Sequence, residues 1–215
     1  MQIDLLEQVE CKVDRSKRLA LRRQLTAAQR EELCRFAGEY FDGPTGYGGY
    51  YYDGRHAPAV RAMIERYELG ARSRVLDVGC AKGFMLYEFV RQGIEDVRGC
   101  DISPYAISQA HPGVKDRLDV ASADRLSYPA ASFDLVYSVD VIHNLLPEQC
   151  DQAIREILRV ARAAAFIQVA SFETEEQRQR LIGWGVTVKT LRSKRQWQET
   201  FLGLGYGGDF YFKTF

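Results

Sequence analysis

The sequence lacks long apolar runs, and no stretch approaches the roughly 18 consecutive apolar residues that a bilayer-spanning helix needs. Its N-terminal residues, with Asp4, Glu7 and Glu10, also lack the basic and apolar segments of a secretory signal. The five cysteines lie far apart and form no C-x-x-C pair, which excludes a disulfide framework and a zinc motif. We therefore expect a cytoplasmic protein that has no membrane contact.

Charge of one sign is not in excess either, because 29 basic residues face 29 acidic ones. This balance makes a nucleic-acid or anionic-membrane partner unlikely on electrostatic grounds. Residues 12–23 are a local exception, with six basic side chains and one acidic. They predict an amphipathic helix with a solvated basic face, and contact with an anionic substrate is the alternative. No histidine and carboxylate cluster has metal-ligand spacing, so we predict no bound metal.

Tyrosine and glycine are concentrated in one place. Five of the twelve tyrosines and six of the eighteen glycines lie between Gly38 and Gly54. The run favours an aromatic loop, because closely spaced glycines break regular elements. Ahead of it, the capping-box spacing of Thr26 and Gln29 predicts a helix over residues 27–40.

From Arg74 onward short β-rich runs alternate with helical ones, and another helix is predicted just before them, over Pro58–Leu69. The predicted strands are Val75–Val78, Val97–Ile102, Leu118–Ala121, Phe133–Val139 and Ala164–Ala170. The predicted helices between them are Phe84–Gln92, Pro104–Ala110 and Pro147–Ala161. This alternation predicts an α/β fold with a doubly wound, mainly parallel sheet, whose ligands bind at the carboxyl ends of the strands.

Acidic residues follow three successive predicted strands. Asp77 stands two residues before Gly79 in the turn LDVGCAKG, Asp101 ends the second strand, and Asp124 follows the third. A carboxylate after the second strand can accept both hydroxyls of a ribose, and Gly79 and Gly83 let a ligand approach the backbone. Helix N-caps are the alternative explanation for these acids.

These residues resemble the class I S-adenosylmethionine-dependent methyltransferases, with Ala81 at a position where that family commonly has glycine. The resemblance implies a Rossmann-like, seven-stranded type of sheet, S-adenosylmethionine as cofactor and S-adenosylhomocysteine as product. It places the methionine end near Asp77, the ribose near Asp101 and the adenine near Asp124, and Cys80 is expected to be a small filler. The cofactor residues that it implies are Asp77, Gly79, Cys80, Gly83, Asp101, Ile102, Ala123, Asp124 and Ser138.

The tyrosine-rich segment also resembles one found ahead of the first motif in small-molecule members of this class. We expect a lid in which Tyr47, Tyr50 or Tyr52 covers the sulfonium and Arg55 pairs with the cofactor carboxylate. A rigid loop packed on the sheet is the alternative. Residues 1–56 would then be a helical N-terminal cap with this lid, and residues 57–215 the catalytic domain.

Catalytic candidates follow the fourth strand, which in the family lies near the transferable methyl. His143 can act as a general base near neutral pH, or it can pack and form hydrogen bonds at a helix start. Asp140 can orient an amine or a hydroxyl. The expected acceptor is a small molecule, such as a sugar, an amino acid or a specialised metabolite, and the protein is expected to be a monomer or a homodimer.

Three alternatives stay open at this stage. An RNA or protein methyltransferase would use the basic residues 12–23. An NAD(P)-binding oxidoreductase also carries an acid after a glycine turn, although the spacing from Gly79 to Gly83 departs from G-x-G-x-x-G. A non-catalytic cofactor-binding subunit would retain the fold alone.

The C-terminal part departs from the family plan, which usually ends in an antiparallel pair of strands. We predict helices over Thr174–Ile182 and Lys194–Leu202, a strand-like segment over Gly185–Leu191 and a last strand over Asp209–Thr214. The final pair is therefore expected to be shortened or rearranged. Four aromatic residues are candidates for a wall of the acceptor pocket or for core packing: Trp184, Trp197, Phe201 and Tyr206.

Overall fold

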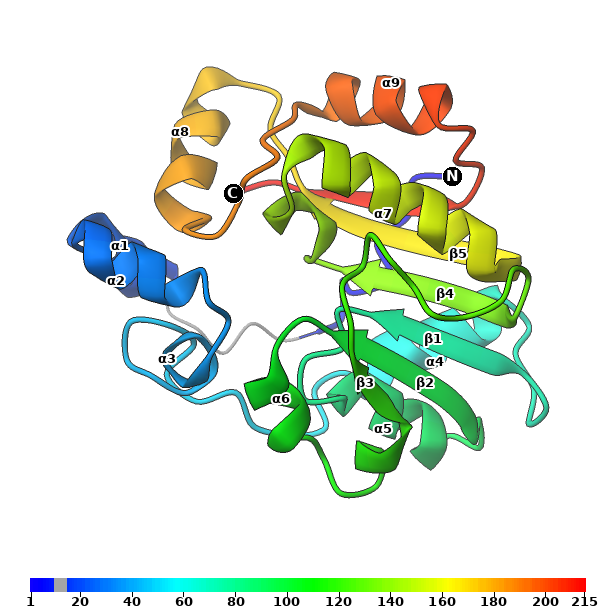
Figure 1. The fold of residues 1–215 in the computed structure, drawn as a ribbon. Helices are drawn as coiled ribbons and strands as arrows, with labels where there is room; N and C mark the ends of the chain where they lie inside the picture. The colour runs from blue at the N-terminus through cyan, green and yellow to red at the C-terminus, as the bar shows by residue number, and fades with distance from the viewer. Residues whose placement is uncertain (10–14) are drawn as a thin grey trace.

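The computed structural model describes residues 1–9 and 15–215, and it has a single six-stranded sheet at its centre (Figure 1). The strand order is β3-β2-β1-β4-β5-β6, and every neighbouring pair is parallel. The carboxyl ends of the strands therefore share one edge of the sheet. The strands are β1 (Arg74–Val78), β2 (Asp96–Asp101), β3 (Leu118–Val120), β4 (Phe133–Val139), β5 (Ala161–Ala170) and β6 (Asp209–Lys213).

Helices cover both faces of this sheet, as the doubly wound prediction requires. Helices α7 (Pro147–Val160) and α9 (Lys194–Gly203) pack on one face, and α4 (Ala57–Arg66) and α5 (Phe84–Arg91) pack on the other. The inner strands are almost continuously apolar because each face meets a separate core. The remaining short elements are α6 (Pro104–Ser108), η1 (Lys115–Arg117) and η2 (Ile142–Asn144).

Three N-terminal helices lie beyond the carboxyl edge of the sheet (Figure 1): α1 (Arg15–Arg23), α2 (Ala27–Leu33) and α3 (Gly38–Phe41). The predicted capping box forms at the start of α2. The single helix predicted over residues 27–40 is wrong, because the chain breaks at Phe36, whose φ of 51° is incompatible with a right-handed helix. The first residues of the predicted basic helix lie outside the described part of the chain.

The C-terminal part forms α8 (Glu175–Trp184), α9 and β6, but the strand predicted over Gly185–Leu191 is wrong. Its backbone turns away from the sheet, and the N–H groups of Lys189 and Thr190 donate to the His143 carbonyl (3.0 and 2.9 Å). The sheet therefore has six strands in the described part of the chain, all parallel, in place of the expected seven-stranded type.

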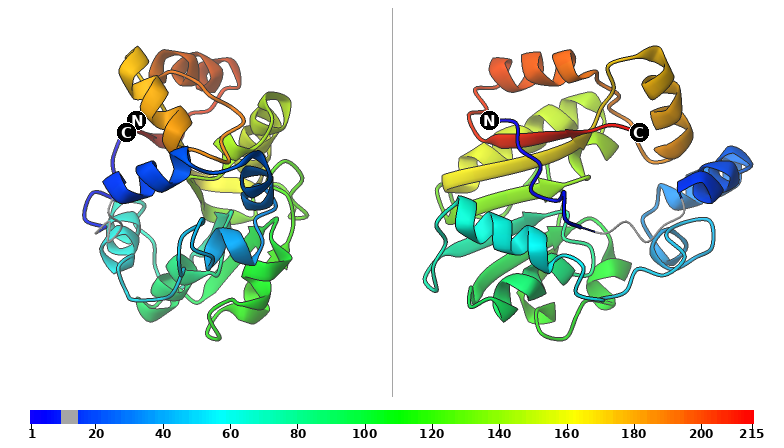
Figure 2. Two further views of the ribbon diagram at one scale, coloured as in Figure 1. Left: turned by 90° about the vertical axis from the view of Figure 1, so that its left-hand side faces the viewer. Right: turned by 180° about the vertical axis from the view of Figure 1, so that it is seen from behind.

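The N-terminal segment takes the place beside β6 that a further strand would fill. Gln2 forms an isolated parallel bridge to Phe210, and Ile3 donates its N–H to the Phe210 carbonyl (2.9 Å). From there the segment crosses the α4 and α5 side of the sheet, as Figure 2 shows from behind, and Leu5 enters the core on that side. The two termini lie at opposite ends of β6 (Figure 2), because Met1 accepts the Phe210 N–H at the start of the strand and Phe215 packs on Trp184 beyond its end.

Candidate active site

Two adjoining cavities open along the carboxyl edge of the sheet, with volumes of about 370 and 630 Å³. The smaller first cavity lies over the ends of β2 and β3, and the larger second cavity lies over the ends of β1, β4, β5 and β6. Five residues line both cavities: Tyr47, Tyr50, Gly79, Val139 and Asp140. These shared residues mark where a ligand would pass from one cavity to the other.

The floor of the first cavity is a carboxylate held by backbone N–H groups. Asp101 accepts from the N–H of Ala81 (2.8 Å) on one oxygen and from the N–H of Ser103 (2.9 Å) on the other. Burial raises the pKa of Asp101, while these two hydrogen bonds act in the opposite direction. Beside it, the Ile102 side chain is 53% exposed, and Ala123 lines the same cavity. The arrangement offers an anchored acceptor for hydroxyl groups next to an apolar surface for a flat ring.

The turn after β1 joins the two cavities through its backbone. Gly79 has φ of 89°, and a Cβ there would lie 2.2 Å from Cγ2 of Val141. Only glycine fits both the conformation and the space. Below the turn, Asp77 is 5% exposed, and burial, with the charge of Asp101 added, raises its pKa to about 8 against the effect of the neighbouring Tyr137.

Two tyrosines of the predicted lid line both cavities. The ring of Tyr50 stacks on Phe84, with centroids 5.0 Å apart and planes at 22°, and Tyr47 packs against Tyr50 at 5.6 Å. Tyr47 lies under the guanidinium of Arg18 from α1, at 5.2 Å from the ring centroid. The tyrosine loop is thus held between the basic helix α1 and the first turn of α5.

The other two predicted lid residues are engaged elsewhere in this structure. The Tyr52 hydroxyl donates to the buried Glu88 carboxylate (2.5 Å), and Tyr52 lines neither of the cavities formed by the described residues. Arg55 lines the second cavity, but its guanidinium forms a bidentate pair with Asp53 (2.8 and 2.7 Å). Binding of Arg55 to a ligand carboxylate would therefore require it to leave Asp53.

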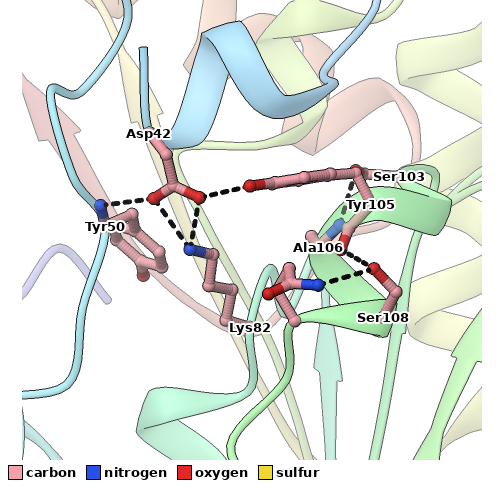
Figure 3. A network of polar contacts seen from close by, with 8 residues as sticks. Asp42, Tyr50, Lys82, Ser103, Tyr105, Ala106 and Ser108 are labelled. Atoms are coloured by element: carbon pink, nitrogen blue, oxygen red, sulfur yellow. Dashed lines mark hydrogen bonds and ion pairs between the residues drawn. The ribbon is translucent and has the colours of Figure 1, made fainter. Parts of the chain in front are cut away.

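An ion-pair network ties the tyrosine loop to the glycine turn (Figure 3). Asp42 accepts from Nζ of Lys82 on both oxygens (2.8 Å each), from the Tyr105 hydroxyl (2.6 Å) and from the backbone N–H of Tyr50 (3.1 Å). Burial would raise the pKa of Asp42, but the bonds from Lys82 and Tyr105 lower it overall. Lys82 sits inside the motif and is only 7% exposed. It fixes the loop over the turn.

Asp140 follows β4 in a strained backbone conformation and faces both cavities. Its φ is 59°, in the left-handed region that non-glycine residues rarely adopt. Its Oδ2 lies 2.5 Å from Nζ of Lys213 on β6. Burial acts to raise the pKa of Asp140, but Lys213, His143 and Gln168 lower it overall, so the carboxylate stays ionised.

His143 is buried beneath Asp140 and lines neither of the two described cavities. Its Nδ1 accepts the N–H of Ala170 (3.2 Å), which leaves Nε2 as the protonated nitrogen of the neutral ring. Burial lowers its pKa to about 4, although the Asp140 charge acts in the opposite direction. The ring therefore holds the end of β5 in place.

Besides Tyr52, three of the residues predicted to contact the cofactor do not line either described cavity. The Ser138 hydroxyl donates to the Val78 carbonyl (2.9 Å) inside the sheet. Gly83 starts α5 with φ of 74°, and a Cβ there would press on Val114 and Leu118. Asp124 accepts the hydroxyl of Ser122 (2.5 Å), and it is Ser122 that lines the first cavity. Cys80 lines the second cavity, where burial raises its pKa well above the ordinary value.

The structure also adds residues that sequence reasoning missed. The cap supplies Phe36, Tyr40 and Phe41 to the first cavity, and the chain ends supply Asp4, Glu7, Tyr211 and Lys213 to the second. No sequence motif identifies these positions as part of the site. The aromatic wall is not formed: Trp197, Phe201 and Tyr206 lie in the core under α9, and Trp184 packs on Arg22 and Phe215.

Comparison with known proteins agrees with this geometry. The methyltransferase domain family model matches residues 76–168. A methyltransferase named GfsG from Streptomyces halstedii is 32% identical over 116 residues, which cover 50% of this chain and 41% of that protein. The 2-methyl-6-phytyl-1,4-hydroquinone methyltransferase of Synechocystis is 33% identical over 111 residues, covering 49% of this chain and 34% of that protein. The chain thus spans less than half the length of these relatives.

A solved structure has the same fold. The YcgJ protein from Bacillus subtilis aligns with a TM-score of 0.57 and 20% identity, covering 69% of this chain and 67% of that one. The described residues contain no helix that is both long and apolar enough to cross a membrane.

Proposed function

We propose that the chain is a class I S-adenosylmethionine-dependent methyltransferase that transfers a methyl group to an oxygen or nitrogen of a small molecule, and the match of residues 76–168 to the methyltransferase domain family supports this. The observation that carries this proposal is the pair of adjoining cavities joined at Gly79, Tyr50 and Asp140. One cavity has the groups that a nucleoside needs, and the other is large enough for a separate acceptor.

The residues present fit the cofactor. The anchored Asp101 carboxylate can accept ribose hydroxyls, and exposed Ile102 offers an apolar surface to adenine. Gly79 lines both cavities, so a ligand there meets bare backbone, and the missing side chain leaves room for Val141, which lines the first cavity. When bound, S-adenosylmethionine supplies an activated methyl group: the acceptor lone pair forms the new bond to carbon, the C–S electron pair goes to sulfur, and the acceptor loses a proton.

The protein's part in this reaction is to position the acceptor and exclude water. We assign positioning of the acceptor to Asp140, because it is ionised and lines both cavities. We assign His143 a supporting role, since its Nδ1 is occupied by the Ala170 N–H and the ring lies below the cavity. The tyrosine faces of Tyr47 and Tyr50 suit a sulfonium cation.

We further propose that residues 15–56 form a cap whose tyrosine loop opens for ligand entry, whereas residues 1–5 of the expected cap pair with β6 and enter the core. The loop is held by polar contacts at Asp42 and Tyr52, which can break and reform, and by few core residues. Proteolysis of the loop tests this idea, because a lid becomes protected when the cofactor binds, whereas a rigid loop is equally protected with and without it.

Calorimetric titration with S-adenosylmethionine and NAD(H), followed by a turnover assay for S-adenosylhomocysteine, tests the proposed function. Binding of S-adenosylmethionine with product release on a small acceptor supports it. Binding of NAD(H) alone would support an oxidoreductase, and cofactor binding without turnover on any acceptor would support a binding subunit. Loss of activity at moderate salt would instead point to RNA, although Arg18 and Arg22 of the basic helix face Tyr47 and Trp184.

A further inference from the structure

A buried polar residue interrupts the apolar face of the sheet beneath the second cavity. Gln168 on β5 is 3% exposed and pairs in register with Val139 on β4 and with Tyr211 on β6. Strand alternation places it on the same face as Phe166, in an otherwise apolar core. A buried amide at this position calls for partners, because leaving its polar atoms unpaired destabilises the fold.

Two buried oxygen atoms at this place lack a donor in good hydrogen-bond geometry among the described residues, although the Gln168 amide lies close enough to Asp140 to lower the pKa of its carboxyl. They are Oε1 of Gln168 and Oδ1 of Asp140, and both residues line the second cavity. The other oxygen of Asp140 is already taken by Lys213. Since orphaned buried acceptors cost free energy, the two oxygens indicate a ligand that brings N–H or O–H donors to them.

The basic side chains around the second cavity are already neutralised. Arg55 is held by Asp53 in a bidentate pair, and Lys213 is held by Asp140. His56, which also lines the cavity, has its pKa lowered to about 4 by burial, so it carries no charge at neutral pH. None of these three groups therefore offers an uncompensated positive charge to an anionic acceptor.

The acidic side chains that line the second cavity decide the sign of its charge. Asp4 and Glu7 of the N-terminal segment line the cavity, and Asp4 is kept in place by accepting the Leu6 N–H (3.0 Å). Both carboxylates lie near Tyr211, whose hydroxyl forms a hydrogen bond with Asp4. The cavity therefore attracts cations and repels carboxylates and phosphates.

We propose that the second cavity takes a methyl acceptor carrying an amine or ammonium group, whose N–H donors are received by Gln168 Oε1 and Asp140 Oδ1. An amine brings two or three donors to the two orphaned oxygens, whereas a hydroxyl brings one. The faces of Tyr47 and Tyr50 add a favourable surface for a cation. This inference rests on the proposed function and names the substrate class for the same site.

The test is an NMR titration of the protein saturated with S-adenosylhomocysteine. Benzylammonium, benzyl alcohol and benzoate are the probes, because they share one ring and differ only in the polar group. We expect benzylammonium to bind at least about tenfold more tightly than benzyl alcohol, with benzoate the weakest, since hydrogen bonds to charged groups are stronger than neutral ones.

Two variants locate the site. Gln168→Leu keeps the volume but removes the oxygen, and we expect about a tenfold loss of benzylammonium affinity with unchanged S-adenosylhomocysteine affinity. Asp4→Asn combined with Glu7→Gln should weaken benzylammonium binding by roughly threefold, and it also serves if Gln168→Leu does not fold. Glu65→Gln, an exposed acid on α4, is the control and should change nothing.

The possible outcomes distinguish failure of the proposed function from failure of this inference about the acceptor. If S-adenosylhomocysteine does not bind, the proposed function itself fails. If it binds, this inference is overturned by any of three results: equal or better binding of benzyl alcohol or benzoate, no benzylammonium binding in the millimolar range, or benzylammonium binding that both variants leave intact. The last of these would place the ammonium elsewhere on the protein.

Discussion

The two cavities are built in different ways, although they meet at the same residues. The first combines strand-end residues such as Gly79, Asp101 and Ala123 with cap residues from positions 34–50, and its key polar contacts come from backbone N–H groups. The second collects residues from positions 4–9, 47–56, 77–85, 139–140, 168 and 211–214. Both cavities thus need the cap as well as the strand ends, and the second depends in addition on the packing of both chain ends.

The largest expected effect comes from the shared turn. Gly79→Ala should abolish measurable cofactor binding and destabilise the fold by about 2–4 kcal/mol, because the new Cβ combines backbone strain with overpacking against Val141. Gly93→Ala is the matched control, since Gly93 has the same φ of 89° and nothing within 4 Å of its Cβ position. Titration calorimetry measures the loss of cofactor affinity, and thermal unfolding measures the loss of stability. Equal affinity and equal stability of the two variants would contradict the steric account.

A smaller effect, confined to the first cavity, is expected at Asp101. Asp101→Asn should lower affinity for S-adenosylhomocysteine by roughly 10- to 100-fold, because charged hydrogen bonds to the ribose are lost. Asp96→Asn, at the exposed start of the same strand, should leave affinity unchanged. Retained affinity in Asp101→Asn would mean that the ribose lies elsewhere.

A third prediction separates two tyrosines of one loop. Tyr50→Leu should weaken binding of S-adenosylmethionine by roughly threefold more than binding of S-adenosylhomocysteine, because only the former carries a sulfonium that an aromatic face attracts. Tyr52→Phe should leave that ratio unchanged and cost about 1–2 kcal/mol of stability, because buried Glu88 loses the Tyr52 hydroxyl donor. Calorimetry with both ligands measures the ratio of the two affinities in each variant. A ratio that changes in Tyr52→Phe but not in Tyr50→Leu would place Tyr52 over the cofactor.

The smallest effect concerns His143 and the pH dependence of stability. Its pKa is about 4 in the fold and about 6.5 in the unfolded chain, so the unfolded state binds an extra proton between these values. The free energy of unfolding should therefore fall by about 1 kcal/mol from pH 6.5 to pH 5.5 on account of this residue. His143→Asn, which keeps an acceptor for the Ala170 N–H, should remove that part of the slope, as chemical denaturation can measure.

The same substitution also tests the role of His143 in catalysis. Turnover by His143→Asn should stay within a few-fold of the parent and keep the parent's pH profile. A collapse of turnover with unchanged stability and cofactor affinity would instead make His143 a base.

The sequence predicted the parts of the molecule that local patterns encode. The five strands from β1 to β5, the capping box at Thr26 and the acid at Asp101 follow from periodicity and spacing, and the structure has them. It could not predict the parallel pairing of β6 with β5 or the docking of the N-terminal segment, because these depend on contacts between chain ends. The segment 185–191 was wrongly predicted as a strand because two of its β-branched residues bond elsewhere: Thr187 donates to the Asn144 side chain and Thr190 to the Leu145 carbonyl.

The most direct measurement is a crystal structure with S-adenosylhomocysteine bound. The account predicts adenine on Ile102, the ribose hydroxyls on Asp101, the sulfur at the junction formed by Gly79, Tyr50 and Asp140, and the methionine end beside Asp77, with the Gln168 side of the second cavity left open. S-adenosylhomocysteine lying across the second cavity, with its amino group on Gln168, would contradict the division into a cofactor site and an acceptor site.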